Sequence, residues 1–343
     1  MDDVGPLNCP RHACERGSMS VPLIYRNFAV LCTIIATVIA IGCAPAERST
    51  AGDASGTPPA KSQRAPLNLI VLGSGGPSAV GRASTCFVLS PDGTPRILID
   101  AGSGSFARLG EAGVSLDRLD LILLTHLHID HTGELPGFLL ARAVATRGPI
   151  DVHIFGPTGA GQFPSTKRFV DLLFGKQGAF AYLTDFSAPL TIVATDVDAR
   201  LRHDAQPQTL LVQNGLRIDA IAGHHFDAPA IIYRVDYKGR SVVFSGDIDP
   251  SGLENLRLIA DHCDLLVFNT VVLDPPHSPA ILYALHTPPK KIGEVAAAAH
   301  VGALLLTHLN PSIDEAHDEV RASINRSYDG PVTFAEDGMR VTP

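Results

Sequence analysis

The stretch Thr125-His126-Leu127-His128-Ile129-Asp130-His131 decides the fold, and it places three histidines and one carboxylate within six positions. It directly follows the apolar run Leu121-Ile122-Leu123-Leu124, which is typical of a strand buried on both faces. Residues two apart in an extended chain share a face, so His126 and His128 can reach a single cation. After a turn, Asp130 and His131 can point at a second position. Imidazole and carboxylate suit zinc and its first-row neighbours, so the stretch predicts a metal site at the rim of a sheet.

The same arrangement recurs further along the chain, where an apolar strand again ends in a residue that can bind metal. These later residues are His224 or His225 after 216–222, Asp247 after 241–244, and His308 after 303–306. A single histidine or aspartate at the end of a strand is more often structural than a ligand. Taken together, the four places supply enough groups for two metal ions.

Composition excludes some classes of function. The chain has 343 residues, of which 45% are hydrophobic and 18% charged, enough for a large core. The formal net charge of −8 argues against nonspecific attraction to a polyanion. Tryptophan is absent, and no aromatic stacking platform is visible. We therefore expect no nucleic-acid partner. A homodimer is one option for the oligomeric state, which the sequence leaves open.

Residues 1–43 predict an export leader, and residues 44–66 a flexible tether. The run 28–42 (FAVLCTIIATVIAIG) is short for a membrane span but suits the apolar region of a secretion signal. Met19 would give a more typical start. The run ends at Cys43 in a context that resembles a bacterial lipoprotein cleavage box, which predicts a periplasmic or cell-envelope protein attached to the membrane through lipidated Cys43. Ordinary cleavage near 44–46 and an uncleaved anchor are the alternatives.

Residues 67–343 predict the folded domain. Its two cysteines, Cys86 and Cys263, have apolar neighbours and favour free buried thiols over a disulfide. The section 160–210 is hard to read and is a candidate for the part that selects the substrate. At the end of the chain, 332–334 and 339–341 are predicted to pair with each other.

The pattern His-x-His-x-Asp-His, followed by a histidine, an Asp in Ser-Gly-Asp and a late Thr-His, resembles the metallo-β-lactamase-fold hydrolase superfamily. The resemblance spans 67–343. It implies an α/β fold, a four-layer αβ/βα sandwich, with the metal site at the edge between two facing sheets.

The resemblance also implies a ligand set for two divalent ions, most simply zinc, with manganese or iron as alternatives. One ion would be held by His126, His128 and His225, with His224 as the alternative to His225. The other would be held by Asp130, His131 and His308. Asp247 would bridge the two ions, and a metal-bridging hydroxide would be the nucleophile.

Asp247 narrows the choice among branches of this superfamily, because the true β-lactamases carry Cys or Ser at the corresponding place. The chain is more similar to tRNA 3′-end nuclease-like (RNase Z-like) phosphodiesterases and to arylsulfatase-like enzymes. Both carry a histidine in a His-Thr/Ser context before the last ligand, here His286-Thr287. The resemblance implies that Asp130 and His286 act in catalysis, with His286 as general acid or anion stabiliser; His277 is a weaker candidate for substrate contact. Asn269 departs from the His or Glu that such enzymes often carry.

These observations predict an exported dinuclear hydrolase that cleaves a small anionic ester, either a phosphodiester or a sulfate ester. A lactone or carboxylic-ester hydrolase of the same fold is the alternative within enzymes. A non-catalytic metal-binding lipoprotein is the alternative outside them.

Overall fold

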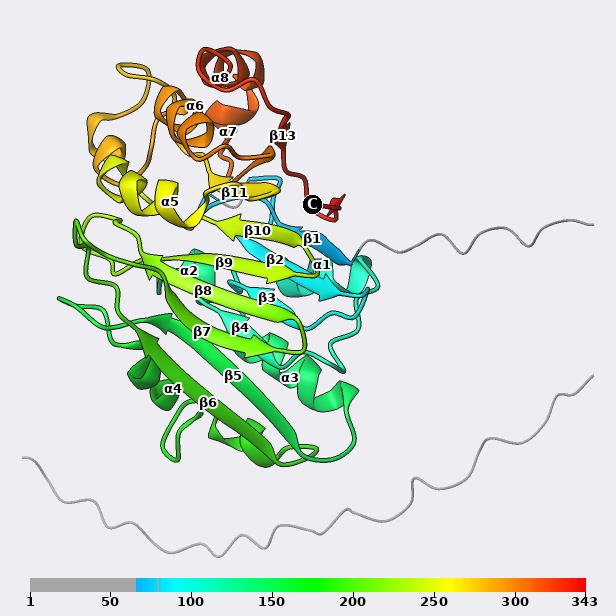
Figure 1. Ribbon diagram of the computed structural model, residues 1–343. Coiled ribbons are helices and arrows are strands. Elements are labelled where there is room, and N and C mark those ends of the chain that lie inside the picture. Colours follow the sequence, from blue (N-terminus) through cyan, green and yellow to red (C-terminus); the bar gives the residue numbers. More distant parts are fainter. Residues whose placement is uncertain (1–65, 79) are drawn as a thin grey trace, which may run out of the picture. The chain divides into compact units, whose positions relative to one another are not determined.

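The computed structural model describes residues 66–78 and 80–343, and its strands form two seven-stranded sheets (Figure 1). The first sheet has the order β14-β1-β2-β3-β4-β5-β6 and the second β13-β12-β11-β10-β9-β8-β7. The strands of the first sheet are β1 (Leu67–Gly73), β2 (Cys86–Pro91), β3 (Ile97–Ile99), β4 (Leu121–Leu123), β5 (Ile150–Pro157), β6 (Leu190–Val197) and β14 (Arg340–Val341). Those of the second are β7 (Gln208–Gln213), β8 (Leu216–Ala222), β9 (Ile231–Tyr237), β10 (Arg240–Phe244), β11 (Leu265–Asn269), β12 (Ala303–Thr307) and β13 (Val332–Phe334).

Helices cover the outer face of each sheet. They are α1 (Ser105–Glu111), α2 (Ile129–Thr132), α3 (Leu135–Ala145), α4 (Thr166–Phe174), α5 (Leu253–Ile259), α6 (Pro289–Ala298), α7 (Pro311–Asp314) and α8 (His317–Ile324), with the 3-10 turns η1 (Ala181–Asp185), η2 (Pro250–Gly252) and η3 (Ala280–Ala284). Within the described residues, no helix is long and apolar enough to cross a bilayer. The predicted leader with Met19 and Cys43, and the tether up to Ala65, lie outside the described residues.

Alternating side chains of the strands build three cores. In β1, Leu69 and Val71 face the second sheet, whereas Ile70 and Leu72 face the helices outside the first sheet. The second sheet behaves in the same way, because its inward side chains join the central core and its outward ones pack beneath α5, α6 and α8. This period of two makes both sheets apolar on both faces. The predicted α/β four-layer sandwich is confirmed.

The directions of the strands explain where polar residues gather. β3, β4 and β5 run parallel, as do β10, β11 and β12. β8 runs in the same direction as β10, because both are antiparallel to β9. The carboxyl ends of β8, β10, β11 and β12 therefore lie at one edge of the second sheet. Residues that follow these strands are brought together although they are far apart in sequence.

The pairing of the last two strands differs from the prediction, whereas the state of the two cysteines agrees with it. The predicted pairing of 332–334 with 339–341 is wrong: β13 pairs with β12 in the second sheet, and β14 pairs with β1 in the first. Each closing strand adds to an existing sheet edge, which satisfies its backbone groups without a hairpin. Cys86 and Cys263 are buried free thiols, as the sequence favours. Burial raises the pKa of Cys263 to about 12.

Candidate metal centre

Strand ends of both sheets deliver the predicted ligands to one place. The loop after β4 carries His126 and His128 and leads into the short helix α2, which carries Asp130 and His131. The remaining three ligands come from the second sheet, in the segments after β8, β10 and β12. They are His225, Asp247 and His308. Most of these side chains are almost completely buried, although His128 is half-buried.

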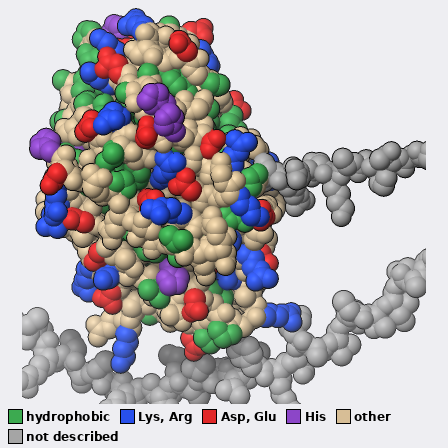
Figure 2. Space-filling view, viewed as in Figure 1, with side chains coloured by type: hydrophobic (Ala, Val, Ile, Leu, Met, Phe, Trp, Pro, Cys, Tyr) green, Lys and Arg blue, Asp and Glu red, His purple; other side chains and the backbone are tan. Residues whose placement is uncertain are grey.

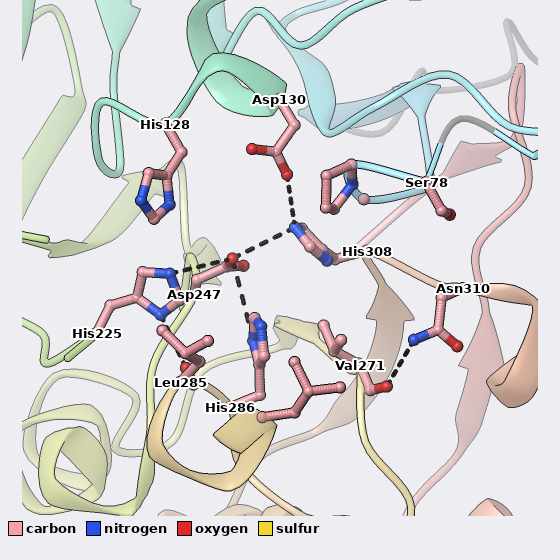
Figure 3. Close-up of a pocket in the computed structure, with 13 residues that line it drawn as sticks. Ser78, His128, Asp130, His225, Asp247, Val271, Leu285, His286, His308 and Asn310 are labelled. Carbon is pink, nitrogen blue, oxygen red and sulfur yellow. Dashed lines mark hydrogen bonds and ion pairs between the residues drawn. The ribbon is translucent and has the colours of Figure 1, made fainter. Parts of the chain in front are cut away.

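The side chains form buried groups in which the ligand atoms all lie within 4.8 Å of one another. Two of these groups match the two predicted sites, and two more contain Asp247. Figure 3 shows Asp247 between His225, His286 and His308. The groups are His126/His128/His225, Asp130/His131/His308, His126/His131/Asp247 and His225/Asp247/His286. The carboxylate shared by the last two groups thus lies between the first two.

Distances from one oxygen of Asp247 describe that central position. Its Oδ2 lies 3.3 Å from Nε2 of His308 and 3.7 Å from Nε2 of His225. The same oxygen lies 3.8 Å from Nε2 of His131 and 3.9 Å from Nε2 of His126. A carboxylate that faces histidines of both groups is placed to serve two cations at once.

Only one of the two consecutive histidines after β8 points into the centre. His225 is 2% exposed, and its Nδ1 lies 2.8 Å from the carbonyl oxygen of Leu285, so Nδ1–H donates there and leaves Nε2 facing the site. The side chain of His224 is 36% exposed, and its Nδ1 instead pairs with Asp249 at 2.6 Å. The structure therefore brings His225, and not His224, to the other ligands.

A buried carboxylate behind the site orients His131. Asp100 accepts hydrogen bonds from the amide and hydroxyl of Thr125 at 2.7 and 2.8 Å, and its Oδ2 lies 2.7 Å from Nδ1 of His131. Burial opposes protonation of His131, but the carboxylates of Asp100, Asp247 and Asp130 outweigh it and raise the pKa of His131 to about 9. Carboxylates behind ligating histidines fix the tautomer of the ring. The role of Asp100 behind His131 was not predicted from the sequence, although an aspartate directly after a buried strand is the pattern that could have indicated it.

Asn269, the residue that departs from the family pattern, holds the central carboxylate. It ends β11, and its Nδ2 donates to Oδ1 of Asp247 at 2.6 Å. Its backbone amide donates to the hydroxyl of Ser245 at 3.1 Å, which ties the ends of β11 and β10 together. The amide therefore occupies one oxygen of Asp247 and leaves Oδ2 free to face the histidines.

His286 completes the ring of histidines from the segment between η3 and α6. It is 6% exposed, and its Nδ1 lies 4.0 Å from Oδ2 of Asp247 without a hydrogen-bond partner. Burial outweighs the nearby carboxylate and lowers the pKa of His286 to about 4, so the ring is neutral near pH 7. His277 lies outside this arrangement, because it is exposed and pairs with Glu319 at 3.2 Å.

The donor set fits divalent metal ions. Nε2 of His131 is buried and has no hydrogen-bond partner, while the other nitrogen of that ring is held by Asp100. An unpartnered buried imidazole nitrogen aimed at two carboxylates is costly unless a cation occupies the space between them. Neutral imidazoles with carboxylates are the ligands that zinc and its first-row neighbours prefer. This chemistry agrees with the predicted ligand set.

Two glycines allow the close approach of backbone to these ligands. Gly246, directly before Asp247, has φ of +57°, and a Cβ there would lie 2.7 Å from Cβ of Thr125. A Cβ on Gly76 would lie 2.4 Å from Cε1 of His308. Both positions therefore require glycine for a stated steric reason.

A cavity of about 320 Å³ opens onto the centre. Besides ligands and His286, its lining contains four apolar side chains and a few polar ones (Figure 3). The apolar ones are Pro77, Val271, Leu282 and Leu285. None of the lining residues belongs to 160–210, the section in which substrate selection is expected. That section instead forms α4, η1 and the edge strands β6 and β7, which extend the two sheets.

Fold and site together define the class of protein. A four-layer sandwich, with histidines and aspartates gathered where the strand ends of its two sheets meet, is typical of metal-dependent hydrolases. Comparison with known proteins agrees, because residues 79–279 match the metallo-beta-lactamase superfamily. The chain belongs to this superfamily. It is also 31% identical over 286 residues to the ribonuclease Z of Mycobacterium avium (strain 104), covering 80% of this chain and 98% of that protein.

Solved structures share the fold at lower sequence identity. The short form of human tRNase Z superposes with a TM-score of 0.60 at 21% identity, covering 80% of this chain and 99% of that one. Zn²⁺-bound PqqB from Methylobacterium extorquens gives a TM-score of 0.57 at 16% identity, covering 80% and 99%. At these identities the likeness concerns the fold.

Proposed function

We propose that this protein hydrolyses a small phosphodiester or sulfate ester at a dinuclear metal centre. The observation that carries the proposal is the shared carboxylate: Asp247 faces His225 of one three-residue group and His308 of the other. A structural zinc site is closed and four-coordinate, whereas this one has more ligands than one ion needs and opens into a cavity. The ribonuclease Z relatives support a phosphodiester as one substrate class.

We propose zinc as the bound metal, since a fold neighbour binds Zn²⁺ and the donors are mainly imidazoles. His126, His128 and His225 would hold one ion; Asp130, His131 and His308 would hold the other. Bound dications supply charge stabilisation and an activated water. Elemental analysis of the full-length protein should find two ions per chain. The control is the double variant His262→Ala/His300→Ala, which removes histidines of the exposed group Asp261/His262/His300 and should not change that number. Retention of two ions in Asp247→Ala would contradict a shared bridging carboxylate.

In this proposal, His286 acts on the leaving alcohol. Hydrolysis joins the water oxygen to phosphorus or sulfur, breaks the bond to the alcohol oxygen, and returns one proton to that oxygen. Because the pKa of His286 is about 4, the ring is neutral at pH 7 and donates one N–H bond to the developing oxyanion. A neutral ring with this pKa supports a role for His286 in stabilising the developing oxyanion, and not in donating a full proton to it.

The test compares 4-nitrophenyl esters of one leaving group: a phosphodiester, a sulfate and a carboxylic ester, each with full-length wild type and with Asp247→Ala. We expect metal-dependent release of 4-nitrophenol from the phosphodiester or the sulfate, reduced at least a thousandfold in Asp247→Ala. Preference for the carboxylic ester would replace the proposal with a carboxylic-ester hydrolase. Equal inactivity of both proteins on all three esters while metal is bound would favour a non-catalytic metal-binding protein.

We further propose, from the sequence alone, that the leader exports the protein and that lipidated Cys43 attaches it to the membrane. Cys43→Ala should move the protein from the membrane fraction to the soluble periplasmic fraction. Recovery of both proteins in the cytoplasm would contradict export.

A further inference from the structure

The lining of the cavity is short of positive charge. Its thirteen residues include no lysine and no arginine. On the face in Figure 2, the described Lys and Arg side chains are interspersed with Asp and Glu and form no continuous basic area. A ligand with several phosphates needs a cationic partner for each, because burying an unpaired charge is costly. The cavity can therefore balance little negative charge beyond what the metal centre itself holds.

One side of the cavity is apolar instead. Leu285 and Val271 lie on the side of His286, away from His128 and Asp130 (Figure 3). Leu282 and Pro77 complete the apolar lining. Because His286 is the residue proposed to face the leaving oxygen, this apolar side lies where the alcohol group of an ester would lie.

The apolar character continues outside the cavity. Ile281, the neighbour of Leu282 in η3, is 63% exposed. Ile129, between ligands His128 and Asp130, is 75% exposed, and Phe226, next to His225, is 58% exposed. Single exposed apolar residues are common on protein surfaces, but these three all adjoin residues that line one cavity. Three exposed apolar residues are thus next in sequence to residues of the cavity lining.

The volume limits the size of the ligand. About 320 Å³ is at the lower end of the range for small-molecule sites and about twice an engineered cavity of ~150 Å³ that binds benzene. The space accommodates a phosphoryl or sulfuryl group together with one ring or a short alkyl chain.

Resting on the proposed hydrolase function, we propose that Val271, Leu282 and Leu285 form a subsite for an apolar alcohol group. The substrate is then a singly charged ester of an aryl or short alkyl alcohol and not a polynucleotide. Leu282 and Leu285 of the η3 segment are the residues that determine this specificity.

The first test uses two monoanionic diesters that keep the same thymidine 5′-phosphoryl group and differ in the leaving alcohol: thymidine 5′-(4-nitrophenyl) phosphate, and the dinucleoside phosphate thymidylyl-(3′→5′)-thymidine. Because the two alcohols also differ in acidity, the ratio of kcat/KM is compared between wild type and variants. We expect kcat/KM to be at least tenfold higher for the first. Leu282→Ser should reduce that preference about ten- to a hundredfold, the range for losing apolar contacts in a specificity pocket. The main-chain carbonyl of Leu282 accepts from the amide of His286 at 2.9 Å, a bond that the substitution retains. Leu172→Ser on α4, equally a leucine but outside the cavity and 48% exposed, should leave the preference unchanged.

The second test does not depend on turnover. Binding of phenylphosphonate and methylphosphonate to the metal-loaded, full-length protein is measured by calorimetry. Tighter binding of the phenyl compound, lost in Leu282→Ser and kept in Leu172→Ser, supports the subsite even if no ester is hydrolysed. The inference would be overturned by equal binding of the two phosphonates, by equal rates on the two diesters, or by preferred cleavage of a precursor tRNA. Hydrolysis of the diesters or of the tRNA would still agree with the proposed hydrolase function.

Discussion

Single side chains in the centre are held in place by hydrogen bonds to groups that are not themselves candidate ligands. Leu285 fixes the ring of His225 through its carbonyl oxygen, Asp100 fixes that of His131, and Asn269 fixes the carboxylate of Asp247. Removing such outer partners typically lowers metal affinity or activity 10- to 100-fold. Three predictions at the scale of the residue follow from these contacts.

The two neighbouring histidines after β8 provide a matched pair. His225→Ala should lower the zinc content and reduce ester hydrolysis more than a hundredfold, because it removes a ring whose Nε2 faces Asp247 at 3.7 Å. His224→Ala should change activity by less than about threefold, since that ring pairs with Asp249 outside the centre. Metal analysis and steady-state rates measure both. The reverse order of effects would restore His224 as the ligand.

Asn269 is expected to act through Asp247. Asn269→Ala should weaken zinc binding about 10- to 100-fold in competition with a chelator, because Oδ1 of Asp247 loses its donor. Asn269→Asp should weaken it further, since it places a second carboxylate 2.6 Å from the first. Unaltered affinity in both variants would show that the orientation of Asp247 does not depend on this hydrogen bond.

Zinc binding should depend on pH through His131. In the metal-free protein, the pKa of His131 is raised to about 9, so near neutral pH the ring carries a proton that a metal ion must displace. Affinity should therefore rise with pH, by roughly tenfold per unit between about pH 6.5 and 8.5, and level off above 9. Calorimetry in buffers of different ionisation enthalpy measures the proton release. A pH-independent affinity over this range would mean that His131 is not a ligand.

At the scale of the element, the parallel strands decide where the chemistry lies. β10, β11 and β12 end at one sheet edge, and they present Asp247, Asn269 and His308 in order across it. The turn between β10 and Asp247 is tight, because Gly246 packs against Thr125 of the other sheet. The position of the Asp247 carboxylate therefore depends on this turn.

Gly246→Ala should destabilise the protein by about 2–4 kcal/mol, the sum of a left-handed backbone and an overpacked contact at 2.7 Å. Gly113→Ala is the control, since Gly113 also has a positive φ (+62°) but would meet nothing within 4 Å. It should cost only about 1–2 kcal/mol. Urea unfolding of both variants in the presence of a chelator measures the difference without a metal contribution. Equal losses would show that Thr125 gives way to the added methyl group.

For the whole molecule, the candidate ligands come from both sheets, so a bound metal ion would hold the two sheets together. Zinc at about a hundred times its dissociation constant should add about 2.7 kcal/mol to the free energy of unfolding for each ion bound. For a domain of this size, that corresponds to a rise of about 5–10 °C in Tm, read from thermal melts with and without chelator. Asp247→Ala should lose most of the rise. An equal rise in wild type and variant would place the stabilising ion elsewhere.

The kinds of candidate ligand, and the strands that end in them, could be predicted from local sequence. Apolar runs ending in His or Asp are local patterns, and burial on both faces follows from their composition. The α/β sandwich itself was predicted from the resemblance of the ligand pattern to the superfamily. The turn at Lys238 and Gly239 is equally local, and β9 and β10 form a hairpin around it.

Which of these groups meet depends on how the distant strands are arranged in space. Whether His224 or His225 faces the centre depends on the rotation of one loop against Asp249 and the carbonyl of Leu285. The contact between Asn269 and Asp247, and the pairing of β13 and β14 with different sheets, join residues distant in sequence. Such contacts are set by strand order and direction across the whole domain, and these are properties that no local stretch of sequence contains.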